Sequence, residues 1–280
     1  MKRLNGFNLF LVLAIAGLTG CGSRQSKKSA INEGKDMPAV TSVPAILYSS
    51  IDTAFYKKYA DADGFPVVSS QQVRDEALPA ACRIISGMLA KRPDIADCMR
   101  KEGCKVMIIG EKEQTLDLPE YRHLGKTEEE LVYWNKRTRG FGGAPEDRIS
   151  ASCGEENLIC LQGDRYEGEN ILIHEFSHII HMVGIAGIEP DFDERLTALL
   201  NNAKEKGLWK DTYALSNKEE YFAETVQSFF NCNRYSEEPN GVHNSINRRE
   251  KLKAYDPDMY AFLLQYFSEE NISICNLIHN

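Results

Sequence analysis

The chain has 280 residues, enough for one large domain or two small ones. Hydrophobic residues make up 42% and charged residues 26%, as in ordinary soluble globular proteins, which excludes a wholly disordered or collagen-like chain. The 41 Asp and Glu against 33 Lys and Arg give a net charge of −8, which argues against nucleic-acid binding because no basic stripe is available to neutralise phosphates.

Residues 1–20 have the features of a secretory leader. Lys2 and Arg3 precede an apolar run that is too short to cross a bilayer of about 30 Å as a helix. The sequence LTGC at 18–21 then resembles a bacterial lipoprotein signal, in which cleavage leaves Cys21 as the lipid-modified N-terminus. We therefore expect an exported bacterial lipoprotein, anchored to a membrane at the periplasmic face or the cell surface. A plain signal peptide followed by a chance cysteine is the alternative.

Residues 21–43 are rich in Ser, Lys and Gly and predict a flexible tether that starts at the lipidated Cys21. Removal of the leader takes Lys2 and Arg3 and no acidic residue, so the net charge falls from −8 to −10. No internal repeat or second linker interrupts the rest. We therefore expect one folded domain over residues 44–280.

Export makes disulfides possible. Once Cys21 is lipidated, seven cysteines remain, so at least one thiol stays free or pairs between chains. Our first prediction is Cys153–Cys160, which flank a short segment, and the second is Cys98–Cys104. No CxxC pair indicates a cysteine metal site. The seven are Cys82, Cys98, Cys104, Cys153, Cys160, Cys232 and Cys275.

Hydrophobic periodicity predicts many helices and few strands in the folded part. Between residues 75 and 91, apolar residues recur at the spacing of one helical face, whereas the run at 105–110 is continuously apolar and ends in glycine, as a central strand does. Residues 138–143 indicate an edge strand or a loop. Helices are predicted over 53–60, 75–91, 93–100, 127–136, 170–183, 191–206, 217–231, 247–254 and 257–267, and further strands over 65–68 and 157–161. This pattern predicts a helix-rich α+β fold with a small sheet.

Residues 171–181 read ILIHEFSHIIH, which contains the motif HExxH on a helix whose other face is apolar. His174 and His178 lie about 6 Å apart along the helix axis and about 40° apart around it, so both imidazoles can reach one ion. Glu175 lies beside the first histidine, where it can accept a proton from water. The alternative is a pair of core or surface histidines with a salt-bridging glutamate.

His181 is a less suitable metal ligand. On a straight helix it lies about 10.5 Å along the axis from His174, a span that zinc–nitrogen bonds of about 2 Å cannot bridge. No glycine lies between His178 and His181 to break the helix. We expect His181 to support the site from behind the ligands or to be packed in the core.

A third ligand is expected from the helix that contains the sequence SNKEEYFAETVQSFF at 216–230. Glu220, Glu224 and Gln227 fall on one polar stripe at positions i, i+4 and i+7, and aromatic and aliphatic residues cover much of the remainder. Burial of carboxylates on such a helix is costly unless they are paired or bind a metal. The alternative is a solvated face.

The two motifs together resemble the zincin metallopeptidases related to the catalytic domain of anthrax lethal factor and to the Pro-Pro endopeptidases. The resemblance rests on HEFSH at 174–178 and YALSNKEEYFAE at 213–224, and it covers about residues 170–231. It implies a zincin-like fold and Zn²⁺ as cofactor. The implied ligands are His174, His178 and Glu220, with Glu175 as general base, Tyr213 as oxyanion stabiliser and Glu224 orienting a ligand.

The folded region is also similar to a broader group of uncharacterised exported HExxH proteins. The chain lacks any counterpart of the toxin's other domains, so no cleavage preference is carried over.

These patterns predict a zinc-dependent endopeptidase, tethered to a bacterial membrane and acting on a peptide or protein substrate. An exposed strand at 139–143 or 158–161 is a candidate for holding the substrate by strand addition. The alternatives are a zinc amidase acting on a non-peptide or cell-wall amide, and a non-catalytic, zinc-containing surface binding lipoprotein. Intact Glu175 and Tyr213 argue against the last, since a purely structural site needs neither. The oligomeric state stays open.

Overall fold

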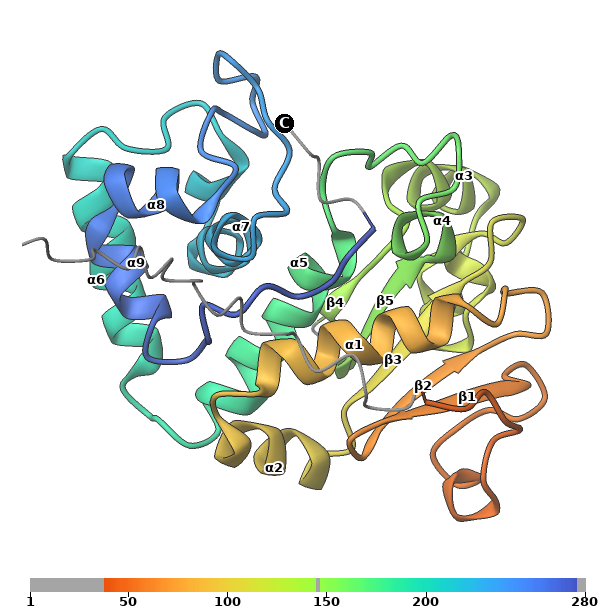
Figure 1. The fold of residues 1–280 in the computed structure, drawn as a ribbon. Coiled ribbons are helices and arrows are strands. Elements are labelled where there is room, and N and C mark those ends of the chain that lie inside the picture. The colour runs from red at the N-terminus through yellow and green to blue at the C-terminus, as the bar shows by residue number, and fades with distance from the viewer. Residues whose placement is uncertain (1–37, 145–146, 276–280) are drawn as a thin grey trace, which may run out of the picture. The chain divides into compact units, whose positions relative to one another are not determined.

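A mixed five-stranded β-sheet forms one layer of the fold (Figure 1). The structure is a computed structural model and describes residues 38–144 and 147–275. The strand order is β1-β2-β3-β5-β4. The three inner strands run parallel to one another, and each edge strand runs antiparallel to its neighbour. The strands are β1 (Lys58–Ala62), β2 (Phe65–Ser69), β3 (Lys105–Ile109), β4 (Gly142–Ala144) and β5 (Asp147–Gly154).

Helices make up most of the remaining structure, and with the sheet they confirm the predicted helix-rich α+β class. The α-helices are α1 (Ala77–Leu89), α2 (Pro93–Lys101), α3 (Glu128–Arg137), α4 (Glu155–Leu158), α5 (Ile171–Ile179), α6 (Phe192–Glu205), α7 (Lys218–Phe229), α8 (Arg249–Tyr255) and α9 (Pro257–Leu263). Short 3₁₀ segments are η1 (Ala45–Leu47), η2 (Thr115–Asp117), η3 (Pro119–Leu124) and η5 (Tyr213–Leu215), and η4 (Ile180–Ile185) continues α5 as a π-helix.

Both faces of the sheet are buried, by different parts of the chain. Val106 and Ile108 of β3 belong to one apolar cluster, and Met107 and Ile109 belong to another, because successive side chains on a strand point to opposite faces. Helices α1 and α5 pack on the first face (Figure 1). The predicted central strand at 105–110 is thereby confirmed.

Two predicted elements are wrong. The helix expected at 53–60 is absent, because residues 58–60 pair with β2 in a hairpin whose turn, Asp63-Gly64, has positive φ at both residues. The strand expected at 157–161 is replaced by the end of α4 and a turn. Here the side-chain amide of Asn157 donates a hydrogen bond to the backbone carbonyl oxygen of Glu169.

Helix α5 is the element that positions the candidate site. Its N-cap Asn170 accepts a hydrogen bond from the backbone N–H of Ile173, and all of its residues except Glu175 are buried. It lies between the β4–β5 edge of the sheet and α7. A Cβ on Gly142 of β4 would lie 2.0 Å from the carbonyl oxygen of Glu175, so glycine is required for this close approach.

The predicted leader, the lipidation site Cys21 and the tether as far as residue 37 lie outside the described residues. Residues 38–43, however, pack on the folded part. Thr41 exchanges two backbone hydrogen bonds with Tyr59, and Val43 is 5% exposed. These last residues of the predicted tether therefore belong to the domain, which begins before residue 44. Among the described helices, none has the length and apolar character needed to cross a bilayer.

Both predicted disulfides are wrong. Cys160 instead pairs with Cys275, with their Cα atoms 5.9 Å apart. The thiol of Cys153 donates to the carbonyl oxygen of Gly154 inside the sheet, and that of Cys98 donates to Val183 of η4, so neither thiol faces its expected partner. The free thiols of the described part are Cys82, Cys98, Cys104, Cys153 and Cys232, which confirms that at least one cysteine stays unpaired.

The Cys160–Cys275 disulfide joins residues 115 positions apart. Because such a cross-link restricts the unfolded chain, we expect Cys275→Ser to lower the free energy of unfolding by about 2–5 kcal/mol, measured by urea denaturation in oxidising buffer. Cys98→Ser removes a free thiol and serves as the control. Equal stability of the two variants, or a non-reducing peptide map without the 160–275 cross-link, contradicts the pairing.

Candidate metal centre

Two histidines of α5 and one glutamate of α7 converge between the two helices. The candidate ligand atoms of His174, His178 and Glu220 all lie within 4.8 Å of one another. The Nε2 atoms of His174 and His178 lie 3.1 and 3.7 Å from Oε2 of Glu220. The i, i+4 spacing therefore brings both imidazoles to one point, as predicted, and Glu220 is the carboxylate that meets them there.

Local hydrogen bonds hold these groups in place. Asn217, the N-cap of α7, accepts a hydrogen bond from the backbone N–H of Glu220 at 2.8 Å, which fixes this glutamate in the first helical turn. His174 is 9% exposed and His178 is 6% exposed. The site is thus a buried polar cluster at the contact of two helices.

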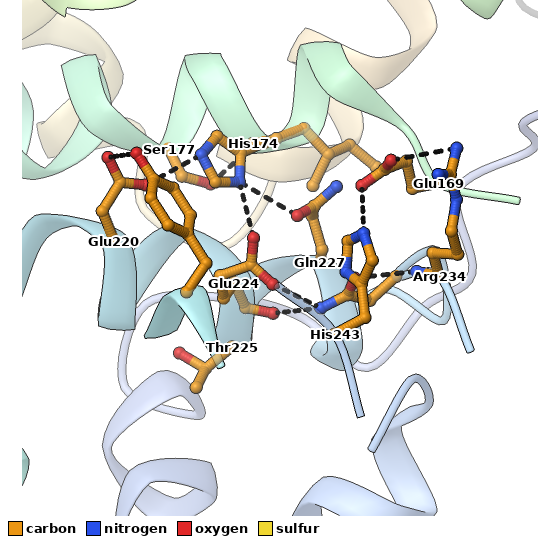
Figure 2. Close-up of polar contacts among 12 residues, drawn as sticks. Glu169, His174, Ser177, Glu220, Glu224, Thr225, Gln227, Arg234 and His243 are labelled. Carbon is orange, nitrogen blue, oxygen red and sulfur yellow. Dashed lines mark hydrogen bonds and ion pairs between the residues drawn. The ribbon is translucent and has the colours of Figure 1, made fainter. Parts of the chain in front are cut away.

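Gln227 is the group that orients His174 (Figure 2). Nδ1–H of His174 donates to Oε1 of Gln227 at 2.9 Å, and Nε2 of Gln227 donates to the carbonyl oxygen of Asn170 at 3.0 Å. The second bond determines which end of the amide faces the imidazole. With Nδ1 engaged, Nε2 of His174 is the nitrogen left for an ion.

Glu224, which the resemblance assigned to the orienting role, is a more distant partner. Its Oε1 lies 3.6 Å from Nδ1 of His174, and its Oε2 accepts a hydrogen bond from Asn233. The two carboxylates of the stripe are thereby separated, since Glu220 faces Nε2 and Glu224 faces Nδ1. Sequence reasoning missed the role of Gln227, although its i+7 position on the stripe was the available signal.

Tyr213 reaches the cluster from η5, just before α7. Its hydroxyl donates to Oε1 of Glu220 at 3.1 Å, and its backbone N–H donates to the carbonyl oxygen of Val242. Burial, together with the charge of Glu220, raises the pKa of Tyr213 to about 12. The hydroxyl is therefore a protonated donor at neutral pH.

Glu175 is half-buried beside the cluster, and within the described part of the chain its carboxylate has no hydrogen-bond partner. Burial raises the pKa of Glu175 to about 7, against the opposing charge of His174. A carboxylate in this position is free to exchange a proton with a bound molecule.

The two histidines of the cluster carry one positive charge between them, on His174. Burial and the charge of His174 lower the pKa of His178 to about 4, so this imidazole is neutral. Burial disfavours charge on His174, but the hydrogen bond to Glu220 and the nearby carboxylates outweigh it and raise the pKa of His174 to about 10. Two imidazole nitrogens and a carboxylate oxygen form a donor set that suits divalent transition metals.

His181 is not brought to the other ligands. It is 1% exposed, its Nε2 donates to Oδ1 of Asp193 at 2.6 Å, and its ring packs against Phe192 and Phe222. It therefore fits the expectation of a packed histidine, and it makes no hydrogen bond to His174, His178 or Glu220.

The cluster lies at the wall of a cleft of about 640 Å³. Gly140, Phe141 and Gly142, leading into β4, line one side, and Glu175 and Tyr213 line it beside the candidate ligands. A molecule in the cleft can therefore contact the general-base candidate, the tyrosine and the edge of the sheet together.

Comparison with known proteins finds no matching family model, no matching curated protein and no matching solved structure.

Replacing each carboxylate of the stripe separates their roles. We expect Glu220→Ala to weaken metal affinity by at least about 100-fold, because it removes a donor atom, whereas Glu224→Ala should weaken it by about tenfold or less. Competition with a chromophoric chelator measures both affinities. A larger loss on Glu224→Ala than on Glu220→Ala contradicts the assignment.

Gln227→Ala removes the acceptor that orients His174. We expect metal affinity to fall about 10- to 100-fold while the variant remains folded. Gln72→Ala, an exposed glutamine far along the chain, is the control. Unchanged affinity in a folded Gln227→Ala variant shows that the imidazole needs no such partner.

Proposed function

We propose that this chain is a zinc-dependent endopeptidase of the zincin class, exported and held on a bacterial membrane through lipidated Cys21. The observation that carries the proposal is the meeting of His174 and His178 with Glu220 inside a cleft, next to a glutamate with no hydrogen-bond partner in the described residues. The resemblance of the two sequence motifs to the lethal factor and Pro-Pro endopeptidase group supports the same assignment.

The donor set fits zinc. His174, His178 and Glu220 would hold the ion, and three protein ligands leave a coordination position open, as catalytic zinc sites require. Zinc, when bound there, supplies Lewis-acid chemistry that polarises a carbonyl group and acidifies water. The imidazole of His178 is already neutral, as a metal ligand must be, whereas the bound ion would take the place of the proton that His174 shares with Glu220.

Glu175 performs the proton transfers in this mechanism. It adjoins the first ligand on α5 and lines the cleft, so it accepts the proton of the attacking water. It then delivers that proton to the leaving amine of the cleaved peptide bond. Its lack of a hydrogen-bond partner in the described residues leaves both carboxylate oxygens available.

Tyr213 stabilises the negative charge that develops on the substrate's carbonyl oxygen. Its hydroxyl is protonated, lines the cleft and donates to the ligand carboxylate of Glu220 until substrate arrives. Such a preformed donor typically contributes about 10²- to 10³-fold to the rate.

The edge of the sheet supplies a place for the peptide. Strand β4 is the last strand of the sheet, and the close approach of Gly142 to Glu175 sets that strand beside the general base. An extended peptide that adds to the free edge of β4 would run along the cleft past Glu175. The other predicted segment, 158–161, forms no strand in the structure.

The decisive test compares wild type with Glu175→Gln. We expect the zinc-loaded chain to generate new termini in a broad peptide library read by mass spectrometry. Glu175→Gln should keep its zinc and lose at least about 10³-fold of the activity, because an amide cannot accept the proton that the carboxylate takes from water. Glu194→Gln, an exposed glutamate of α6, is the control.

Each other outcome rejects part of the proposal. A fully active Glu175→Gln variant removes this residue from the mechanism. Hydroxamate binding without cleavage of any peptide indicates a non-peptide or cell-wall amide as substrate. A zinc-containing chain that binds no hydroxamate has a closed structural site, and then a binding role remains.

A further inference from the structure

The cleft has a second end, which is lined by arginines although the whole chain carries a net charge of −8. Arg137 ends α3, Arg165 lies in the loop before α5, and Arg234 follows α7. In Figure 2, the Glu169–Arg234 pair lies on the opposite side of His174 from Glu220. Arg234 therefore lies apart from Glu220 of the candidate metal centre.

Arg234 is held in a fixed position by its neighbours. Its Nε donates to the carbonyl oxygen of Glu167 at 3.0 Å, and its Nη2 donates to that of Arg165 at 2.8 Å. The same Nη2 lies 3.2 Å from Oε1 of Glu169. Within the described residues Nη1 keeps no partner, so one edge of a preorganised guanidinium remains available.

The other two arginines are more exposed. Arg165 donates to the carbonyl oxygen of Lys136 and stacks over Tyr166, which restricts its side chain. Arg137 makes no hydrogen bond or ion pair with any described residue, and its charge acts on Tyr213. A bound group near the tyrosine would therefore meet an uncompensated cation.

A buried histidine, His243, also lines this end of the cleft. His243 is 7% exposed and lines the cleft, its Nε2 lies 3.7 Å from Oε2 of Glu169, and its buried Nδ1 has no hydrogen-bond partner among the described residues. His243 therefore adds a second kind of polar side chain to the lining of this end.

We propose that the end of the cleft formed by Arg137, Arg165 and Arg234 is a subsite for a carboxylate of the substrate, either an acidic side chain or a free C-terminus. This inference rests on the proposed peptidase function. Guanidinium groups bind carboxylates through paired, charge-assisted hydrogen bonds. Glu169 also lines this end and pairs with Arg234, so the cations left to attract the carboxylate are Arg137 and Arg165, which at physiological salt act over about 8 Å.

The test uses two pools of nine-residue peptides with acetylated N-termini and amidated C-termini. At one position the acidic pool has Asp and Glu and the neutral pool has Asn and Gln, and the pools are otherwise identical. We expect the zinc-loaded full chain to cleave the acidic pool about tenfold or more faster, and Arg165→Gln and Arg137→Gln each to reduce that preference several-fold. Repeating the neutral pool with free C-termini distinguishes the two sources of the carboxylate.

Arg122→Gln is a matched control for Arg165→Gln. Arg122 is also exposed, donates to one backbone carbonyl, that of Asp117, and stacks over one aromatic ring, that of Phe55, but it does not line the cleft. Its replacement should leave the charge preference unchanged. Equal loss in the control and in Arg165→Gln overturns the subsite.

A binding arm separates failure of the subsite from failure of the proposed function. Fluorescently labelled pools are titrated with the Glu175→Gln chain, which needs no turnover. If the acidic pool binds more tightly, Arg165→Gln abolishes this difference and wild type cleaves neither pool, the subsite is supported and the peptidase function is rejected. Cleavage with no charge preference keeps the peptidase and overturns the subsite.

Discussion

The hydrogen-bond chain from the carbonyl oxygen of Asn170 through Gln227 to His174 is the interaction on which the site depends. It joins the N-cap of α5 to the last turn of α7 through residues that are at most 9% exposed. Buried polar groups must find partners, so this pairing selects one register of the two helices. In that register His174 and His178 face Glu220, and a slip of one turn would leave the amide and the imidazole unpaired.

Two further contacts hold the helix pair from outside. Buried Asp256 accepts hydrogen bonds from Tyr221 of α7 and from the indole of Trp209, and it also caps α9. On the other side, Gly142 lets the sheet edge touch α5 at Glu175. The same contacts that complete the core therefore place the edge strand β4, Glu175 and the His174–His178–Glu220 cluster around one cleft. Stability and site geometry thus depend on the same contacts.

Local patterns in the sequence predict the parts of the fold whose stabilisation is local. The helical faces and the HExxH spacing are of this kind, and so is the apolar run at 105–110. Strand β5 was not predicted because residues 147–154 are mostly small or polar. Its Ser150 and Ser152 are buried because the strand pairs with β3 and β4 on either side. The Cys160–Cys275 pair joins residues 115 apart, a proximity that only the folded chain creates.

The choice between Glu220 and Glu224 shows why spacing alone cannot complete a site. About 6 Å along the helix axis, slightly more than one turn, separates Glu220 from Glu224, so periodicity places both on the same stripe and does not distinguish them. In the fold, the imidazole of His174 lies between the two carboxylates. Its Nε2 faces Glu220, and its Nδ1 faces Glu224 and Gln227. Because the amide of Gln227 is the closer acceptor, it holds the Nδ1 proton, and Nε2 is left facing Glu220 in the candidate metal centre. Gln227, a neutral residue that a search for charged ligands does not select, thus fixes the orientation in which His174 faces Glu220.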